Sequence, residues 1–115
     1  NATISKNSTI GVGVIIQSNC NVSVNVKIGD FIKLNTSANV MHDVTIGDFS
    51  TIAPNSVLLG NVNIGKRCYI GSNATILPGI QVCSDVTIGA GSVVTKNITK
   101  PGTYIGSPAK ELKKK

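Results

Sequence analysis

The chain is poor in the residues that build aromatic cores and metal centres. Among 115 residues there is no Trp, and there are only two Phe, two Tyr, one His and three cysteines without CxxC spacing. A single histidine excludes a zinc site made of three histidines. Isolated cysteines are expected to be core thiols that stay reduced in the cytoplasm. We therefore expect a cytoplasmic protein without a metal site.

Long hydrophobic runs and acidic residues are also scarce. No apolar run approaches the roughly 18 residues that a membrane helix needs, and we expect no signal peptide. Eleven Lys and Arg against five acidic residues give a formal charge of +6, concentrated in a C-terminal cluster. This cluster is either a solvated tail or a patch for phosphates. Without an aromatic platform or a recognition helix, nucleic-acid binding is not expected. The cluster is Lys110, Lys113, Lys114 and Lys115.

A period of six residues runs through nearly the whole chain. Every sixth residue from position 4 to position 94 is aliphatic, and the residues two positions before these are small or apolar, Cys20 and Cys68 among them. Six matches neither a helix nor plain strand alternation, and it is the hexapeptide repeat of a parallel β-helix. The aliphatic series is Ile4, Ile10, Ile16, Val22, Ile28, Leu34, Val40, Ile46, Ile52, Leu58, Ile64, Ile70, Ile76, Val82, Ile88 and Val94.

Three hexads make one triangular coil, so residues 18 apart stack above one another. The repeat predicts an all-β, single-stranded parallel β-helix of about five coils over residues 1–98. Two columns of residues 18 apart hold almost only Asn, Asp, Ser and Gly, which tolerate positive φ at corners. Residues 99–115, where the period fails, are expected to form a short C-terminal tail with a helical turn or an extended course.

His42 is the one side chain that indicates acid–base chemistry. It follows the inward Val40 by two residues, which directs it outward near a corner, and the residue one coil further on is Gly60. The missing side chain of Gly60 leaves space beside the imidazole, and its backbone N–H can donate to an oxyanion. Asp43 either orients the imidazole as a carboxylate partner or only fills a corner where Asn and Asp are expected.

Four segments carry a resemblance to a known family. They are residues 35–47 (NTSANVMHDVTIG), 60–65 (GNVNIG), 76–79 (ILPG) and 106–110 (GSPAK). Together they resemble the C-terminal domain of the sialic-acid O-acetyltransferase family, which includes nucleotide-linked amino-sugar N-acetyltransferases. The resemblance covers essentially the whole chain. It implies a left-handed winding and an acetyl-CoA-dependent transfer of acetyl to an amino or hydroxyl group of a bacterial sugar.

The resemblance also implies an oligomeric assembly and an N-terminal domain that we expect this chain to lack. The assembly is a homotrimer with its active sites between subunits. The chain begins at Asn1 with the repeat already in phase, so we expect the Rossmann-like N-terminal substrate domain of the family to be absent from it. The identity of the acceptor, and the choice between O- and N-acetylation, are then not readable from this chain.

Roles for individual residues follow from the same resemblance. His42 is expected to be the general base and Asp43 its acidic partner, while Asn35 lines the acceptor side. Gly60 is expected to present its backbone amide to the thioester oxygen. The acceptor then attacks the thioester directly, since none of the three cysteines is placed for an acyl-enzyme.

Further positions are expected along the cosubstrate. Ser72 and Ala90 lie one coil apart and match positions whose main chain contacts the pantetheine arm. Lys96, with the tail lysines, is expected near the CoA phosphates. Thr51 stands where some amino-sugar enzymes of the family carry a second histidine near the cofactor, so this chain departs from them there.

Two other functions are open from the sequence. One keeps the fold and acetyl-CoA but transfers to a small non-sugar acceptor, such as an amine or a serine-like compound. The other is a non-catalytic trimeric β-helix scaffold. The pairing of His42 with Gly60 argues against the scaffold, because a purely structural coil does not need it.

Overall fold

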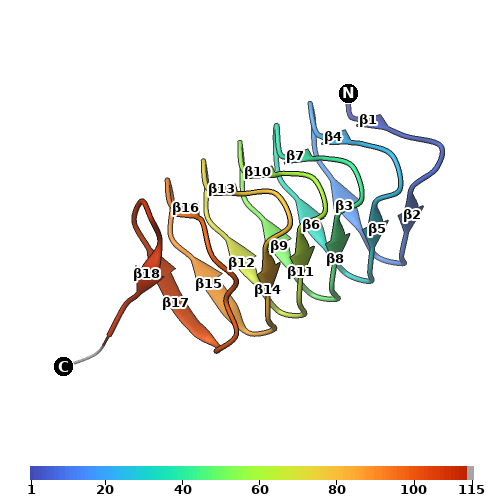
Figure 1. The fold of residues 1–115 in the computed structure, drawn as a ribbon. Helices are drawn as coiled ribbons and strands as arrows, with labels where there is room; N and C mark the ends of the chain where they lie inside the picture. The colour runs from blue at the N-terminus through green and yellow to red at the C-terminus, as the bar shows by residue number, and fades with distance from the viewer. Residues whose placement is uncertain (114–115) are drawn as a thin grey trace.

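The structure is a computed structural model that describes residues 1–113, and it is a solenoid of short strands (Figure 1). These residues contain no helix, and so none that could cross a membrane. The strands are β1 (Thr3–Ile4), β2 (Thr9–Ile10), β3 (Ile15–Ile16), β4 (Asn21–Val22), β5 (Lys27–Ile28), β6 (Lys33–Leu34), β7 (Asn39–Val40), β8 (Thr45–Ile46), β9 (Thr51–Ile52), β10 (Val57–Leu58), β11 (Asn63–Ile64), β12 (Tyr69–Ile70), β13 (Thr75–Ile76), β14 (Gln81–Val82), β15 (Val86–Ile88), β16 (Val93–Val94), β17 (Gly102–Ile105) and β18 (Lys110–Glu111).

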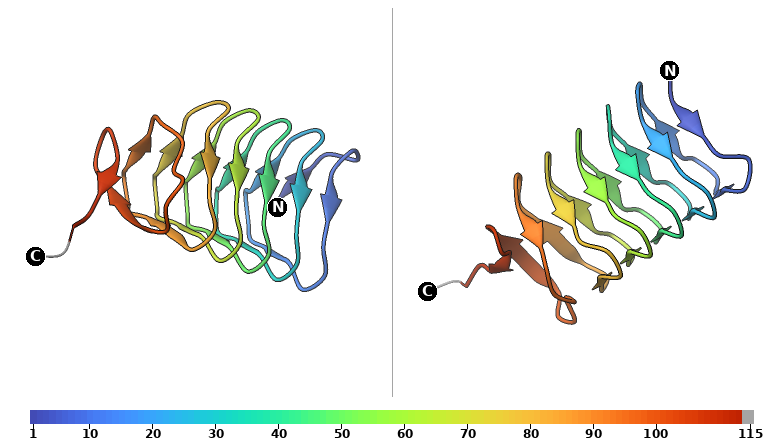
Figure 2. Two further views of the ribbon diagram at one scale, coloured as in Figure 1. Left: turned by 60° about the horizontal axis from the view of Figure 1, so that its bottom comes forward. Right: turned by 45° about the horizontal axis from the view of Figure 1, so that its top comes forward.

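Three sheets form the faces of a triangular prism (Figure 2). Sheet A holds β1, β4, β7, β10, β13 and β16; sheet B holds β2, β5, β8, β11 and β14; sheet C holds β3, β6, β9, β12, β15, β17 and β18. From β1 to β16 the paired residues are 18 apart, as in Val40 opposite Leu58. The predicted left-handed parallel β-helix is confirmed. Strands β1 to β16 make a little over five coils, and β17 brings the solenoid to about six turns.

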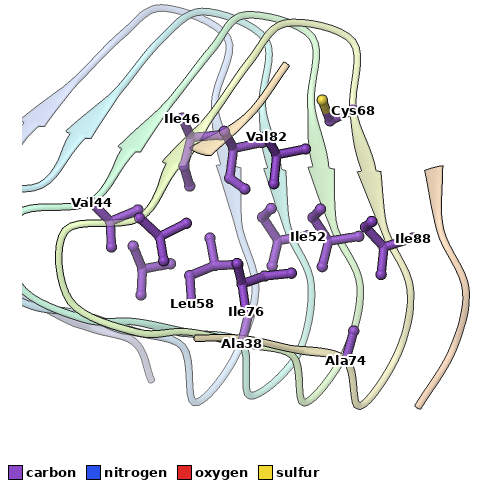
Figure 3. Packing of buried hydrophobic residues seen from close by; sticks show 14 of the residues in the cluster. Ala38, Val44, Ile46, Ile52, Leu58, Cys68, Ala74, Ile76, Val82 and Ile88 are labelled. Atoms are coloured by element: carbon purple, nitrogen blue, oxygen red, sulfur yellow. The ribbon is translucent and has the colours of Figure 1, made fainter. Parts of the chain in front are cut away.

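The aliphatic residue of each hexad packs inside the prism. From Val22 to Val94 every one of them is at most 3% exposed. Figure 3 shows Ile52 and Ile88 in one such column. Ile4 and Ile10 are 43% and 38% exposed because no coil packs on their outer side. The core is therefore a stack of aliphatic layers.

The corners between the sheets adopt the left-handed backbone region that the two polar columns predicted. The A–B corner has positive φ at Asn25, Asp43, Asn61 and Gly79. The C–A corner has it at Asn19, Ser37, Asn55, Asn73 and Gly91. A side chain that bonds locally, or no side chain, tolerates this region best. The corner columns are thus confirmed as turns.

The B–C corner differs, because bulky residues adopt positive φ there. Phe31, Phe49, Arg67 and Asp85 have φ between 54° and 64°. Their side chains interact from coil to coil: the two Phe rings stack at 5.5 Å, and Arg67 Nε donates to Asp85 Oδ1 at 2.7 Å. The hydrogen bond from Arg67 lowers the pKa of the exposed Asp85 carboxyl. The side chains at the B–C corner therefore make contacts between coils at positions where the backbone conformation is unfavourable.

The chain after β16 departs from the expected tail. Instead of a helical turn or an unattached extended segment, β17 pairs in parallel with β15 and adds a strand to sheet C. β18 then folds back antiparallel on β17 (Figures 1 and 2). The hexad pattern cannot predict this hairpin, because β17 is offset from β15 by 16 residues, as in Val86 opposite Gly102.

Candidate functional site

His42 and Asp43 form a hydrogen-bonded pair at the A–B corner. Nδ1 of His42 lies 2.9 Å from Oδ2 of Asp43, and the two side chains are 52% and 45% exposed. Neighbouring residues in a regular strand point apart, but Asp43 has φ 60°, which turns its carboxylate toward the ring. Asp43 therefore fills a corner and also orients the imidazole. With Nδ1–H donating to the carboxylate, the free lone pair of the ring is on Nε2.

The imidazole of His42 lies over Gly60 of the next coil. A Cβ on Gly60 would collide with Nε2 and Cε1 of the ring, and Gly60 itself is buried. The sequence led us to expect open space beside the imidazole. The structure differs, because the ring itself fills the space over Gly60. Any larger residue at position 60 would move Nε2.

The residues predicted to contact the acceptor and the pantetheine arm lie at another corner of the prism. Asn35, Ser72 and Ala90 follow strands β6, β12 and β15 of sheet C and lie in the C–A corner. His42 and Gly60 lie at the other edge of sheet A. One chain therefore does not bring the predicted acceptor and pantetheine positions to the histidine.

Three turn amides of the predicted site have no acceptor within residues 1–113. They are the N–H groups of Gly60, Ser72 and Ala90. At the B–C corner, side chains of the following coil accept from the equivalent amides: Asp48 from Asp30 N–H at 2.8 Å, and Ser84 from Lys66 N–H at 2.9 Å. The amides of Gly60, Ser72 and Ala90 are therefore free to donate to a ligand, whereas those of Asp30 and Lys66 are not.

Lys96 and Thr51, which are predicted near the cosubstrate, are not adjacent to His42. Lys96 stands in the same column as His42, three coils further along, which is about 14 Å at the strand spacing. Thr51 lies on β9 in sheet C and is half-buried. Lys110 and Lys113 are exposed, whereas Lys114 and Lys115 lie outside the described residues. The roles of these residues stay predictions.

A polar groove adjoins the histidine pair on its N-terminal side. It has a volume of about 370 Å³ and is lined by residues of the A–B corner and of the outer face of sheet B, with Asp43 at one end. The sequence reasoning missed it. The available signal was Lys27, the only cation in a column that otherwise holds Thr9, Thr45, Asn63 and Gln81.

The cysteines show no sign of nucleophilic chemistry. Cys20 and Cys68 are buried in the inward register, as predicted. Burial raises the pKa of the Cys68 thiol, which keeps it protonated near neutral pH. Cys83 is half-buried and at a different corner from His42.

Comparison with known proteins supports the resemblance read from the sequence. A family profile described as the hexapeptide repeat of succinyl-transferase matches residues 61–96. A search of curated protein sequences finds no match. Among solved structures, the acetyltransferase domain of PglB from Neisseria gonorrhoeae superposes with a TM-score of 0.95 and 36% identity over 96% of this chain.

Two further structures are similar. PerB from Caulobacter crescentus, solved with CoA and GDP-perosamine, has a TM-score of 0.96 and 33% identity over 97% of this chain. WeeI from Acinetobacter baumannii has a TM-score of 0.73 and 31% identity over 95%. The chain spans only about half of these solved chains: 54% of the PglB acetyltransferase domain and of PerB, and 57% of WeeI. The chain is thus a hexapeptide-repeat β-helix domain, and its resemblance to sugar acetyltransferase domains is confirmed.

Proposed function

We propose that the chain is an acetyl-CoA-dependent acetyltransferase domain that modifies an amino or hydroxyl group of a sugar. The observation that carries the proposal is the His42–Asp43 pair, with Nε2 of the ring held against Gly60. The PglB domain has been solved with acetyl coenzyme A, and PerB with CoA and GDP-perosamine. Three free cysteines fit a cytoplasmic enzyme.

The pair suits direct transfer with a general base. Asp43 accepts a hydrogen bond from Nδ1–H, so Nε2 is the nitrogen that takes the proton of the acceptor as its nitrogen or oxygen attacks the thioester carbonyl. The new N–C or O–C bond forms as the C–S bond breaks, and the proton passes from His42 to the departing thiolate. Turn amides such as that of Gly60 are suited to stabilise the negative charge that develops on the carbonyl oxygen.

A cyclic trimer would complete the site. His42 and the turn amides of Ser72 and Ala90 lie at opposite edges of sheet A, so a second chain must supply one of the two edges. If three chains turn sheet A toward a common axis, the A–B corner of each meets the C–A corner of the next. The outer face of sheet A and its edge at the A–B corner support this arrangement, because they carry half-buried apolar residues: Met41, Val57, Leu59 and Val93.

Mixing two inactive variants tests the shared site. We expect His42→Ala and Ala90→Trp each to abolish transfer, the first by removing the base and the second by filling the cosubstrate cleft. When the two are unfolded together and reassembled in equal amounts, about one quarter of the sites combine two intact corners, so a corresponding part of the wild-type rate should return. Mixed oligomers that form but stay inactive would place the whole site within one chain.

Asp43→Asn separates the orienting role of Asp43 from its corner role. Asparagine tolerates positive φ, so the fold and the melting temperature should change little. The charge that supports the imidazolium is lost, so kcat should fall by about 10-fold or more, with the KM for acetyl-CoA unchanged. Asn61→Asp, at the same corner one coil on, is the matched control and should keep full activity. If Asp43→Asn keeps the wild-type kcat, Asp43 is only a corner residue.

A further inference from the structure

The groove beside His42 has features that neither the base nor the turn amides use. Its walls are Asn7, Asn25 and Asp43 from the A–B corner, and Thr9, Lys27 and Thr45 from the outer face of sheet B. The buried Val26 lies at its floor. Its lining includes Asp43, the hydrogen-bond partner of His42, so a molecule bound in the groove lies next to this pair.

Lys27 is an unpaired cation between two hydroxyl groups. Strand β5 pairs with β2 and with β8, so Thr9 and Thr45 lie directly opposite Lys27 on either side, about 4.8 Å away along the sheet. Within residues 1–113 no acidic side chain forms an ion pair with Lys27. An ammonium flanked by two hydroxyl donors is suited to a carboxylate or a phosphate.

The corner end of the groove has a different chemistry. The side chains of Asn7 and Asn25 are exposed and make no hydrogen bond to another described residue. Oδ2 of Asp43 faces His42, which leaves Oδ1 as a free acceptor. Free amides and a carboxylate oxygen, which both donate and accept, are suited to the hydroxyl groups of a sugar.

We propose that this groove binds the sugar acceptor: Lys27, Thr9 and Thr45 hold its anionic group, and Asn25 and Asp43 hold hydroxyl groups next to His42. The proposal rests on the proposed function. Both acceptor types under consideration carry an anion, since a sialic acid has a carboxylate and a nucleotide-linked sugar has phosphates. The groove therefore selects acceptors by charge, through a residue that takes no part in the chemistry.

A binding experiment tests the groove without any turnover. The probes are dTDP, as the phosphate source, and N-acetylneuraminate, as the carboxylate source. Each is titrated into wild type, Lys27→Met and Lys66→Met, with the amide NMR spectrum as the readout. Lys66 is the matched control, because it loses the same charge at the B–C corner, where its closest acidic group, Asp48, is 3.9 Å away.

We expect one of the probes to shift the amides of Asn25, Lys27 and Thr45 in wild type and in Lys66→Met. In Lys27→Met the dissociation constant should rise by about 10-fold or more, since a hydrogen bond to a charged group is lost. Whichever probe binds identifies the anion. The proposal is overturned if neither probe shifts these amides, or if Lys27→Met binds as tightly as wild type.

Kinetics distinguish this inference from the proposed function. With an anionic amino sugar as acceptor, Lys27→Met should raise the KM of the acceptor by about 10-fold while kcat and the KM for acetyl-CoA stay unchanged. With the same sugar lacking its anionic group, Lys27→Met and wild type should behave alike. Equal losses with both sugars would overturn the anion contact. If the probes bind in the groove but no sugar is acetylated, the proposed function fails and the binding site stands.

Discussion

Replacing His42 by alanine is expected to lower kcat by about 10²–10⁴-fold, the range over which a positioned general base accelerates proton transfer. The side chain is 52% exposed and outside the core, so the melting temperature should stay close to that of wild type. The rate of thiol release at saturating acetyl-CoA and sugar measures kcat. Calorimetry on the same sample measures acetyl-CoA binding, which should be nearly unaffected.

Added imidazole gives this prediction a second readout. In His42→Ala a free imidazole can occupy the space over Gly60 and accept the proton, so part of the lost rate should return as its concentration rises. Lys66→Met, at the B–C corner, should neither lose activity nor respond to imidazole. If His42→Ala transfers acetyl groups at the wild-type rate, the general-base mechanism is wrong, although the fold and the resemblance remain.

Gly60→Ala is expected to lower kcat by about 10²-fold or more, although it neither adds nor removes a reactive group. The new methyl group would occupy the place of Nε2 and Cε1 of His42, so the ring must swing away from its position. The methyl meets the far end of an exposed side chain, and Gly60 does not have positive φ, so the coil itself should remain intact. The amide N–H of residue 60 is kept. Circular dichroism and kcat together check the prediction.

A double mutant shows whether Gly60 acts through the histidine. Because Gly60→Ala works by displacing the ring, it should have little further effect once His42 is alanine, so the two losses should not add. If Gly60→Ala lowers the residual rate of His42→Ala by its full factor, the methyl group obstructs the cosubstrate itself, and ring placement is not the reason for the glycine.

The sequence predicted the coils well because the signal repeats. Each hexad carries one inward aliphatic residue, so stacking residues 18 apart gives the sheets, their register and two of the corner columns. The B–C corner was not predicted, because Phe31 and Arg67 are poor choices for positive φ on local grounds. Only their contacts with the next coil favour that conformation, and such contacts depend on side-chain rotamers.

The site was predictable in part for the same reason. Residues 42 and 60 share one position in the 18-residue coil, which placed His42 beside Gly60, and the structure confirms that contact. The same arithmetic separates Asn35 and Ser72 from His42 by one face of the prism. The direction of the imidazole depends on its side-chain rotamer, and the groove at Lys27 depends on how far the surrounding side chains project from the surface. The period of the sequence contains neither.

The central claim is that these coils bind acetyl-CoA for transfer, and calorimetric titration of wild type with acetyl-CoA tests it most directly, because it needs no knowledge of the acceptor. We predict saturable binding with one site per chain, retained in His42→Ala and lost in Ala90→Trp. Absence of saturable binding in wild type would contradict the account and leave the chain as a structural β-helix.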